Sequence, residues 1–306
     1  MDKLLVTRPE TLIGAAALAA LGPRLDIVGG DVPTDAAALR NAVLEGAPQL
    51  VIHTGPFSVA GWDVGGLGLP SLTNQVGGAA EIDLAVRLAA ACRDVRAKLV
   101  VVVTDGMFAG PHMFHNENAR PNAAGPFARH AAAIERKLVG TGALVVRSHA
   151  YGWCPSTFGM NYAERMFHEL TGELPCPVDA VRHATPILAT DLAERLYEAY
   201  RLGLSDLLHI TGAERTSPYR FAAELAASLG VPGRFVQLTA KPDAGSRINV
   251  EETTLNTTAF RRATKRPLPM LREGLARFAE QAFNGYRRQI GGAESTPREM
   301  LEPQAA

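Results

Sequence analysis

The sequence of 306 residues has few cysteines, no excess of charge of either sign and no long apolar run. Its three cysteines are widely spaced without a Cys-x-x-Cys pair, which gives no disulfide or zinc framework and fits a reducing cytosol. Basic and acidic residues number 31 each, so nothing indicates nucleic acid or an anionic membrane as a partner. No apolar stretch reaches the roughly 18 residues that span a bilayer, so we expect a cytoplasmic protein.

Short apolar runs alternate with alanine-rich segments of helical pattern. The apolar runs predict strands at 3–7, 24–32, 49–55, 97–105 and 143–152. The segments between them predict helices at 11–22, 35–46, 75–95 and 123–140. This alternation predicts an α/β fold, a doubly wound parallel sheet of Rossmann type with helices on both faces.

Ligands of such sheets bind at the carboxyl ends of the strands. We therefore expect one cleft around His53, Thr104, Asp105 and the stretch from Ser148 to Tyr151, all of which follow or end apolar runs. We assign 1–152 to the Rossmann-type domain, 153–290 to a smaller substrate-side lobe interwoven with the sheet, and 291–306 to a polar tail.

The order of the motifs resembles the extended short-chain dehydrogenases, and within them the dTDP-4-dehydrorhamnose reductase group. Residues 74–77 look like that family's asparagine-containing helix, and "VTDGMFAG" at 103–110 is similar to its Ser-Thr-Asp-Tyr-Val-Phe-x-Gly strand end. Glu117 and Pro121 match an acid and a proline of its loop, and "VRSHAYG" at 146–152 is like its Arg-Thr-x-x-x-Tyr-Gly strand. The resemblance gives Thr104 the role of the catalytic hydroxyl and implies a sugar nucleotide as ligand.

The loop after the first strand departs from the family's Gly-x-x-Gly-x-x-Gly pattern. It reads "RPETLIG", so Arg8 and Thr11 replace two glycines and only Gly14 remains. Those glycines let the backbone lie against a dinucleotide pyrophosphate, and Pro9 supplies no amide N–H. Asp31 suits a ribose hydroxyl but is equally a turn residue. The sequence therefore predicts no cofactor, with NAD(P) bound weakly or not at all.

The family's general acid, the tyrosine of a Tyr-x-x-x-Lys motif, is also missing. Counting back from Glu135 puts Phe127 at the tyrosine position and Ala131 at the lysine position. Phenylalanine has no proton to give, and loss of a general acid costs on the order of 10²–10⁴ in rate. We expect no ordinary ketone reduction at this site.

Histidines are the candidate replacements, since six of the eight lie between residues 112 and 183. In one interpretation His112 or His115, with Asp105 or Glu117, performs acid–base chemistry; in the other, these histidines bind substrate or pack the loop. His130, beside the missing lysine, is a third candidate proton donor. No third ligand stands at a metal-binding spacing, so we predict no metal site.

The remaining candidates concern ligand binding. Arg147 and Arg182 suit a diphosphate, but either is equally a structural ion pair. Tyr151 can stack on a sugar or pack in the core. The predicted ligand pocket comprises His53, Asp105, Glu117, Phe127, Arg147, Tyr151 and Arg182.

Three hypotheses follow, in this order: a small-molecule-binding or regulatory protein, an enzyme with rebuilt non-redox acid–base chemistry, and an NAD(P)H-dependent reductase of a nucleotide-linked 4-keto sugar. We also expect a homodimer, because the helices at 77–95 and 127–140 carry small residues suited to close packing, and a protein partner is compatible with the regulatory hypothesis.

Overall fold

The computed structural model describes residues 1–28, 36–64, 78–157, 159–172, 174–237 and 252–292. Six strands form the central sheet, in the order β2-β1-β3-β4-β5-β9. Their bounds are β1 Lys3–Val6, β2 Asp26–Ile27, β3 Leu50–His53, β4 Lys98–Thr104, β5 Leu144–Ser148 and β9 Asp206–His209. All neighbouring strands are parallel, which confirms the predicted sheet, and Thr104 ends β4.

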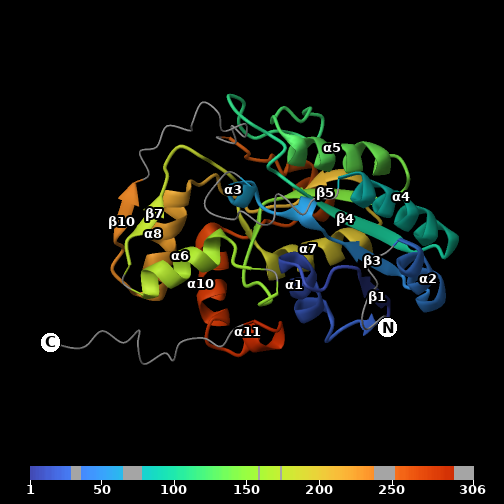
Figure 1. Cartoon of the computed structure of the whole chain (residues 1–306), viewed down its shortest axis with the longest axis horizontal. Helices are drawn as coiled ribbons and strands as arrows, with labels where there is room; N and C mark the ends of the chain where they lie inside the picture. The colour runs from blue at the N-terminus through green and yellow to red at the C-terminus, as the bar shows by residue number, and fades with distance from the viewer. Residues whose placement is uncertain (29–35, 65–77, 158, 173, 238–251, 293–306) are drawn as a thin grey trace.

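Helices cover both faces of this sheet (Figure 1). On one face lie α1 Leu12–Leu21 and α7 Ala189–Arg201; on the other lie α2 Ala36–Gly46, α4 Gly78–Asp94 and α5 Pro126–Leu138. In β4, Val100 and Val102 pack into the core on the side of α1 and α7. Val101 and Val103 pack into the core on the side of α2, α4 and α5. Burial on both faces explains why this strand is apolar from residue 99 to residue 103.

The smaller lobe has its own core, rich in aromatic rings. Trp62, Tyr151, Trp153 and Phe278 all lie in it with 1% or less of their surface exposed. Its elements are α3 Gly61–Val64, β6 Ala150–Tyr151, α6 Tyr162–Thr171, β7 Cys176–Val178, β8 Ile187–Leu188, α8 Pro218–Leu229, β10 Phe235–Gln237, α10 Leu271–Gln281 and α11 Tyr286–Gln289. Two further short helices pack on the central sheet: η1 Pro56–Ser58 against β4 and α5, and α9 Thr258–Thr264 against β9.

The second half of the chain also contributes to the central sheet. β9 pairs with β5 at the edge of the sheet, and α7 packs against α1. Two further pairs of parallel strands, β6 with β8 and β7 with β10, lie outside the central sheet. The division at residue 152 stays a prediction, and residues 293–306 of the predicted tail lie outside the described residues.

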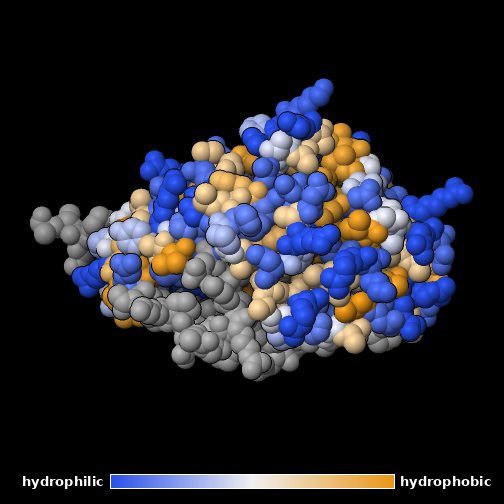
Figure 2. All heavy atoms as spheres, turned by 90° about the horizontal axis from the view of Figure 1, so that it is seen from above, coloured by the Kyte–Doolittle hydropathy of each residue, from blue (hydrophilic) through white to orange (hydrophobic). Residues whose placement is uncertain are grey.

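The surface is mixed in character. On the face seen from above, polar side chains lie among apolar ones rather than in one band (Figure 2). Within the described ranges, no helix has both the length and the apolar character needed to cross a membrane.

The first turn of α1 packs tightly on the loop that precedes it. The Thr11 hydroxyl accepts a hydrogen bond from the Gly14 N–H at 3.1 Å, so Thr11 caps the helix. A Cβ atom on Gly14 would lie 2.0 Å from the Arg8 carbonyl oxygen, a backbone atom that cannot swing away. This position requires glycine because the loop and helix touch there.

We expect Gly14→Ala to destabilise the fold by about 1–3 kcal/mol, the usual cost of overpacking. Gly46→Ala is the matched control, since a Cβ there meets its neighbours at an ordinary 3.5 Å, and alanine in a helix is favoured by about 0.5–1 kcal/mol. Urea unfolding of both variants measures this. Equal stability of the two variants would contradict the close contact.

Candidate functional site

The predicted site residues fall into two groups. Thr104 and Asp105 lie where β4 ends, next to α3 and to His149, which the sequence analysis did not single out. Glu117 and Arg147 lie in a second group with Glu135 and His209, between α5, β5 and β9. Asp105 and the pair of Glu117 and Arg147, all expected in one ligand pocket, therefore lie in two distinct polar centres.

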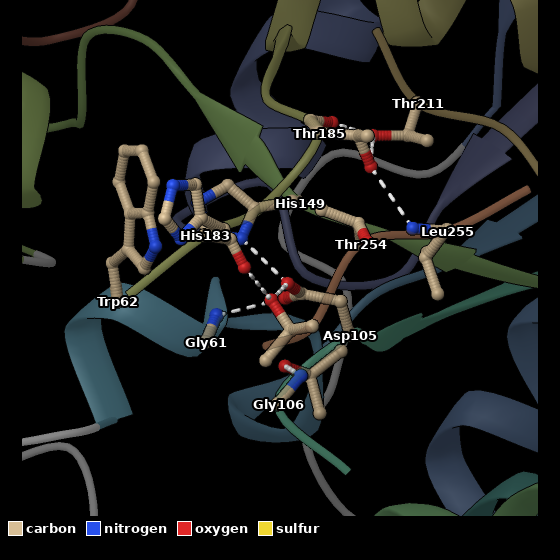
Figure 3. A network of polar contacts seen from close by, with 12 residues as sticks. Gly61, Trp62, Asp105, Gly106, His149, His183, Thr185, Thr211, Thr254 and Leu255 are labelled. Atoms are coloured by element: carbon tan, nitrogen blue, oxygen red, sulfur yellow. Dashed lines mark hydrogen bonds and ion pairs between the residues drawn. The ribbon is translucent and has the colours of Figure 1, made fainter. Parts of the chain in front are cut away.

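Asp105 is the centre of the first group and has no exposed surface. Its Oδ1 accepts a hydrogen bond from the Gly61 N–H at 2.8 Å, at the start of α3. Its Oδ2 lies 2.7 Å from Nδ1 of His149 and also accepts from the Thr253 hydroxyl. Figure 3 shows the carboxylate between Gly61 and the His149 ring. Three donors from separate segments compensate the burial of this charge.

Thr104 belongs to the same packed unit. Its Oγ1 accepts a hydrogen bond of 2.8 Å from the Gly106 N–H, which leaves the hydroxyl proton free to be donated. A Cβ atom on Gly106 would lie 3.0 Å from this oxygen and 3.1 Å from the Gly61 Cα. The small residues at 61 and 106 therefore allow α3 to approach the end of β4.

α3 connects this unit with the smaller lobe. Trp62 packs edge-on against His149, with ring centroids 4.7 Å apart. Asp63 accepts a hydrogen bond from the Tyr162 N–H at 2.8 Å and pairs with Arg165 at 3.2 Å, at the start of α6. Burial outweighs these contacts and raises the pKa of Asp63 to about 6.

Arg147 forms a buried ion pair, one of the two alternatives left open by the sequence. Its Nε and Nη2 donate to the two carboxylate oxygens of Glu135 at 2.8 and 2.6 Å. The guanidinium also lies over the Phe108 ring, 4.9 Å from its centroid. Glu117 and Arg147 line a cavity of about 590 Å³ between α5 and the 117–123 loop, with Glu135 at its wall.

His209 completes this second group. Nη1 of Arg147 donates to Nε2 of His209 at 3.1 Å, so Nδ1 carries the proton and donates to the Asn256 carbonyl oxygen at 3.1 Å. Burial, followed by the Arg147 charge, lowers the pKa of His209 to about 3. His115 stacks on Phe108 with centroids 4.2 Å apart, and burial lowers its pKa as well. These contacts are those of packed, neutral histidines.

The other histidine candidates lie apart from Thr104. His112 is exposed on its loop, and His130 packs against Gly78 at the start of α4. His53 at the end of β3 bonds the Thr7 hydroxyl at 2.7 Å, and burial, with a smaller effect of Arg8, lowers its pKa to about 3.

The remaining pocket candidates are enclosed or paired. Phe127 is buried in the first turn of α5, and Tyr151 is buried in the core of the smaller lobe. Arg182 pairs with Asp179 at 2.5 Å and donates to the Trp62 carbonyl oxygen at 3.4 Å. No group of three or more potential metal ligands occurs among the described residues.

The two side chains that replace glycines in the loop before α1 both have partners within the protein. The Thr11 side chain points inward, bonded to the Arg8 carbonyl and to the Thr54 hydroxyl at 2.7 Å. The Arg8 side chain turns to α4, where it meets Glu81 at 2.7 Å. Gly14 keeps the close packing, and because its N–H bonds the Thr11 hydroxyl, the N–H groups at this helix end that lack a partner among the described residues are those of Leu12 and Ile13. Asp31 lies outside the described residues.

Comparison with known proteins finds one family and many solved structures of this fold. The RmlD substrate binding domain family matches residues 31–283. A dTDP-4-keto-6-deoxy-D-glucose reductase from Streptomyces niveus is 28% identical over 279 residues, which cover 87% of this chain and 93% of that protein.

Several of these structures hold a cofactor, and two serve as examples. The dTDP-4-dehydrorhamnose reductase of Bacillus anthracis in complex with NADP has a TM-score of 0.74 at 19% identity, over 92% of this chain and 99% of that one. The Bordetella bronchiseptica enzyme WbmH in complex with NAD⁺ has a TM-score of 0.68 at 17% identity, over 95% of this chain and 100% of that one.

These findings contradict the prediction of no cofactor, because relatives that share the fold over nearly their whole length hold NADP or NAD⁺. The physical reason for the error lies in side-chain direction. The sequence analysis treated Arg8 and Thr11 as obstacles to the pyrophosphate, whereas Thr11 points into the protein and Arg8 pairs with Glu81.

We expect Glu135→Gln to lower the free energy of unfolding by about 3–5 kcal/mol, because it leaves the Arg147 charge buried without its partner. Glu194→Gln breaks the exposed pair of Arg24 and Glu194 and should cost less than about 1 kcal/mol. Urea titrations of both variants provide the comparison. A small change in the free energy of unfolding of Glu135→Gln would show that the stability of the fold does not depend on this ion pair.

The lowered pKa of His209 predicts a pH dependence of stability. Because the folded-state pKa of about 3 lies below the unfolded value of 6.5, the unfolded state binds the proton first, and stability is lost as pH falls from 6.5 towards 3. His209→Gln keeps a donor and an acceptor but cannot titrate. As the pH falls from 6 to 4, the free energy of unfolding of His209→Gln should rise relative to that of wild type by about 1.4 kcal/mol per pH unit. The exposed His112→Gln serves as control, and parallel curves for His209→Gln and wild type would refute the assignment.

Proposed function

The chain belongs to the RmlD substrate binding domain family, and on that premise we propose that it binds a nucleotide-linked keto sugar together with NADP(H) at the carboxyl edge of the six-stranded sheet. The observation that carries the proposal is the packed unit at the end of β4, where the Thr104 hydroxyl keeps its proton for a ligand oxygen. A keto-sugar reductase is 28% identical to this chain, and the match covers 93% of that protein, which supports the class of sugar.

The cofactor part of the proposal rests on the start of α1. The close packing at Gly14 and the unpartnered N–H groups of Leu12 and Ile13 suit a pyrophosphate, and the neutral His53 adds no charge. When bound, a reduced nicotinamide supplies hydride to a carbonyl carbon. The chain's own residues hold the sugar, exclude water and provide the proton.

The proton donor sets this chain apart from the reductases that it resembles. Counting back from Glu135 puts Phe127 and Ala131 at the positions of the tyrosine and the lysine, and both side chains are buried and apolar. If no other group gave a proton, turnover would be lower by about 10²–10⁴. The protein would then serve chiefly in binding. A reductase with another proton donor is the second candidate function, favoured by the buried Nε2 of His149, whose ring bonds Asp105 and which has no partner among the described residues.

Calorimetry with NADPH, and separately with dTDP-4-keto-6-deoxy-D-glucose, tests the proposal. We expect both to bind wild type, and NADPH at 100 times its Kd to add about 2.7 kcal/mol of stability. Gly14→Ala should weaken NADPH binding about tenfold or more by shifting the phosphate-facing turn, while Gly46→Ala leaves it unchanged. Absence of binding of either ligand to the folded wild-type protein would sink the proposal.

A further inference from the structure

His149 is a buried histidine to which the family resemblance gives no role. It follows Ser148, the last residue of β5, and Ser148 is the cross-strand neighbour of Thr104. Its Nδ1 lies 2.7 Å from Oδ2 of Asp105. A carboxylate in this position fixes the tautomer and the orientation of an imidazole and stabilises its protonated form.

The ring of His149 is held on two further sides. Trp62 packs edge-on at a centroid distance of 4.7 Å and an angle of 75°, and Tyr162 lies at 5.5 Å and 54°. These rings come from α3 and α6, while Asp105 follows β4. Because three elements fix the ring, its second nitrogen has a defined direction, as proton transfer requires.

That second nitrogen, Nε2, has no hydrogen-bond partner among the described residues, although it is buried. The neighbouring Ser148 hydroxyl is also buried and unpartnered within the same part of the chain. Buried polar atoms are almost always paired, and one without a partner costs free energy. A ligand oxygen brought to Nε2 would satisfy this nitrogen.

We infer that His149, oriented by Asp105, donates the proton to the carbonyl oxygen of the bound keto sugar and so replaces the missing tyrosine. The inference rests on the proposed function. Thr104 adds a hydrogen bond to the same oxygen, since its Oγ1 accepts from Gly106 and Gly106 lies against Gly61, whose N–H bonds Asp105.

The step balances with the reduced nicotinamide, which would be oxidised as it supplies the hydride, and with water as the source of the proton that returns to the ring. In the starting state the imidazolium of His149 donates its Nδ1–H to Asp105 and its Nε2–H to the carbonyl oxygen. As a hydride with its electron pair adds to the carbonyl carbon, the C=O π bond breaks and its electrons form an O–H bond with the Nε2 proton. The product is an alcohol, neutral His149 takes up a proton from water, and Asp105 stays ionised throughout.

Binding experiments come first, because they separate this inference from the function on which it rests. We use protein with ¹⁵N-labelled histidine and add dTDP-4-keto-6-deoxy-D-glucose without cofactor. One histidine Nε2 signal should shift on binding, and His149→Gln should remove that signal. In parallel, calorimetry should show that His149→Gln binds NADPH as wild type does.

Kinetics supply the second test. With NADPH and the same sugar, His149→Gln should lower kcat about 100-fold with little change in KM. Asp105→Asn should also lower kcat. His168→Gln, on α6 beside Phe167, is the control and should keep wild-type rates. Imidazole added to the smaller His149→Gly variant should restore part of kcat, which a purely structural role of His149 would not produce.

Four results would overturn the inference. Binding of the sugar without a shift of the His149 signal shows that Nε2 does not touch it. Turnover by wild type that persists in folded His149→Gln shows that the proton comes from elsewhere. Binding of both ligands without turnover at any pH leaves the proposed binding function intact but removes the catalytic role. Absence of binding removes both.

Discussion

The burial of the Asp105 carboxylate is the constraint on which the arrangement of this molecule depends. A charge without contact to water is tolerated only where donors surround it, and here the donors come from residues 44 positions before, 44 after and 148 after it in the chain. The end of β4, the start of α3, the end of β5 and the segment at Thr253 must therefore meet at one point. α3 connects this point with the smaller lobe, since Trp62 packs in the core of the lobe and Asp63 accepts a hydrogen bond from the first turn of α6.

The fold was predictable because its signals are local and repeated. The run from residue 97 to 105 reads as a strand buried on both faces, and β4 ends at Thr104 as expected. The elements of the second half were harder to predict because several are very short. β6 and β8 have two residues each, too few for any periodic pattern, and they owe their existence to pairing with each other.

The site was only partly predictable, because its chemistry depends on side-chain contacts that the spacing of residues in the sequence does not reveal. Arg147 and Glu135 stand 12 positions apart, and nothing in that spacing separates an ion pair from a phosphate contact. His149 lay within the stretch from Ser148 to Tyr151 that was expected at the cleft, but its contact with Asp105 depends on the strand register, which only the structure shows. The error over the cofactor has the same origin: residue types at 8 and 11 were known, but the directions of their side chains follow from partners at Glu81 and Thr54.

The position of β9 has a consequence for how the chain is made. This strand closes one edge of the sheet, yet it is formed by residues 206–209, long after the five other strands have left the ribosome. Until then the backbone groups of β5 stand open on that side, an edge prone to pairing with other chains. His209 arrives with the same strand and satisfies Arg147. A nascent or truncated chain that stops before residue 206 is therefore a candidate for chaperone binding, even though most of its sheet is already encoded.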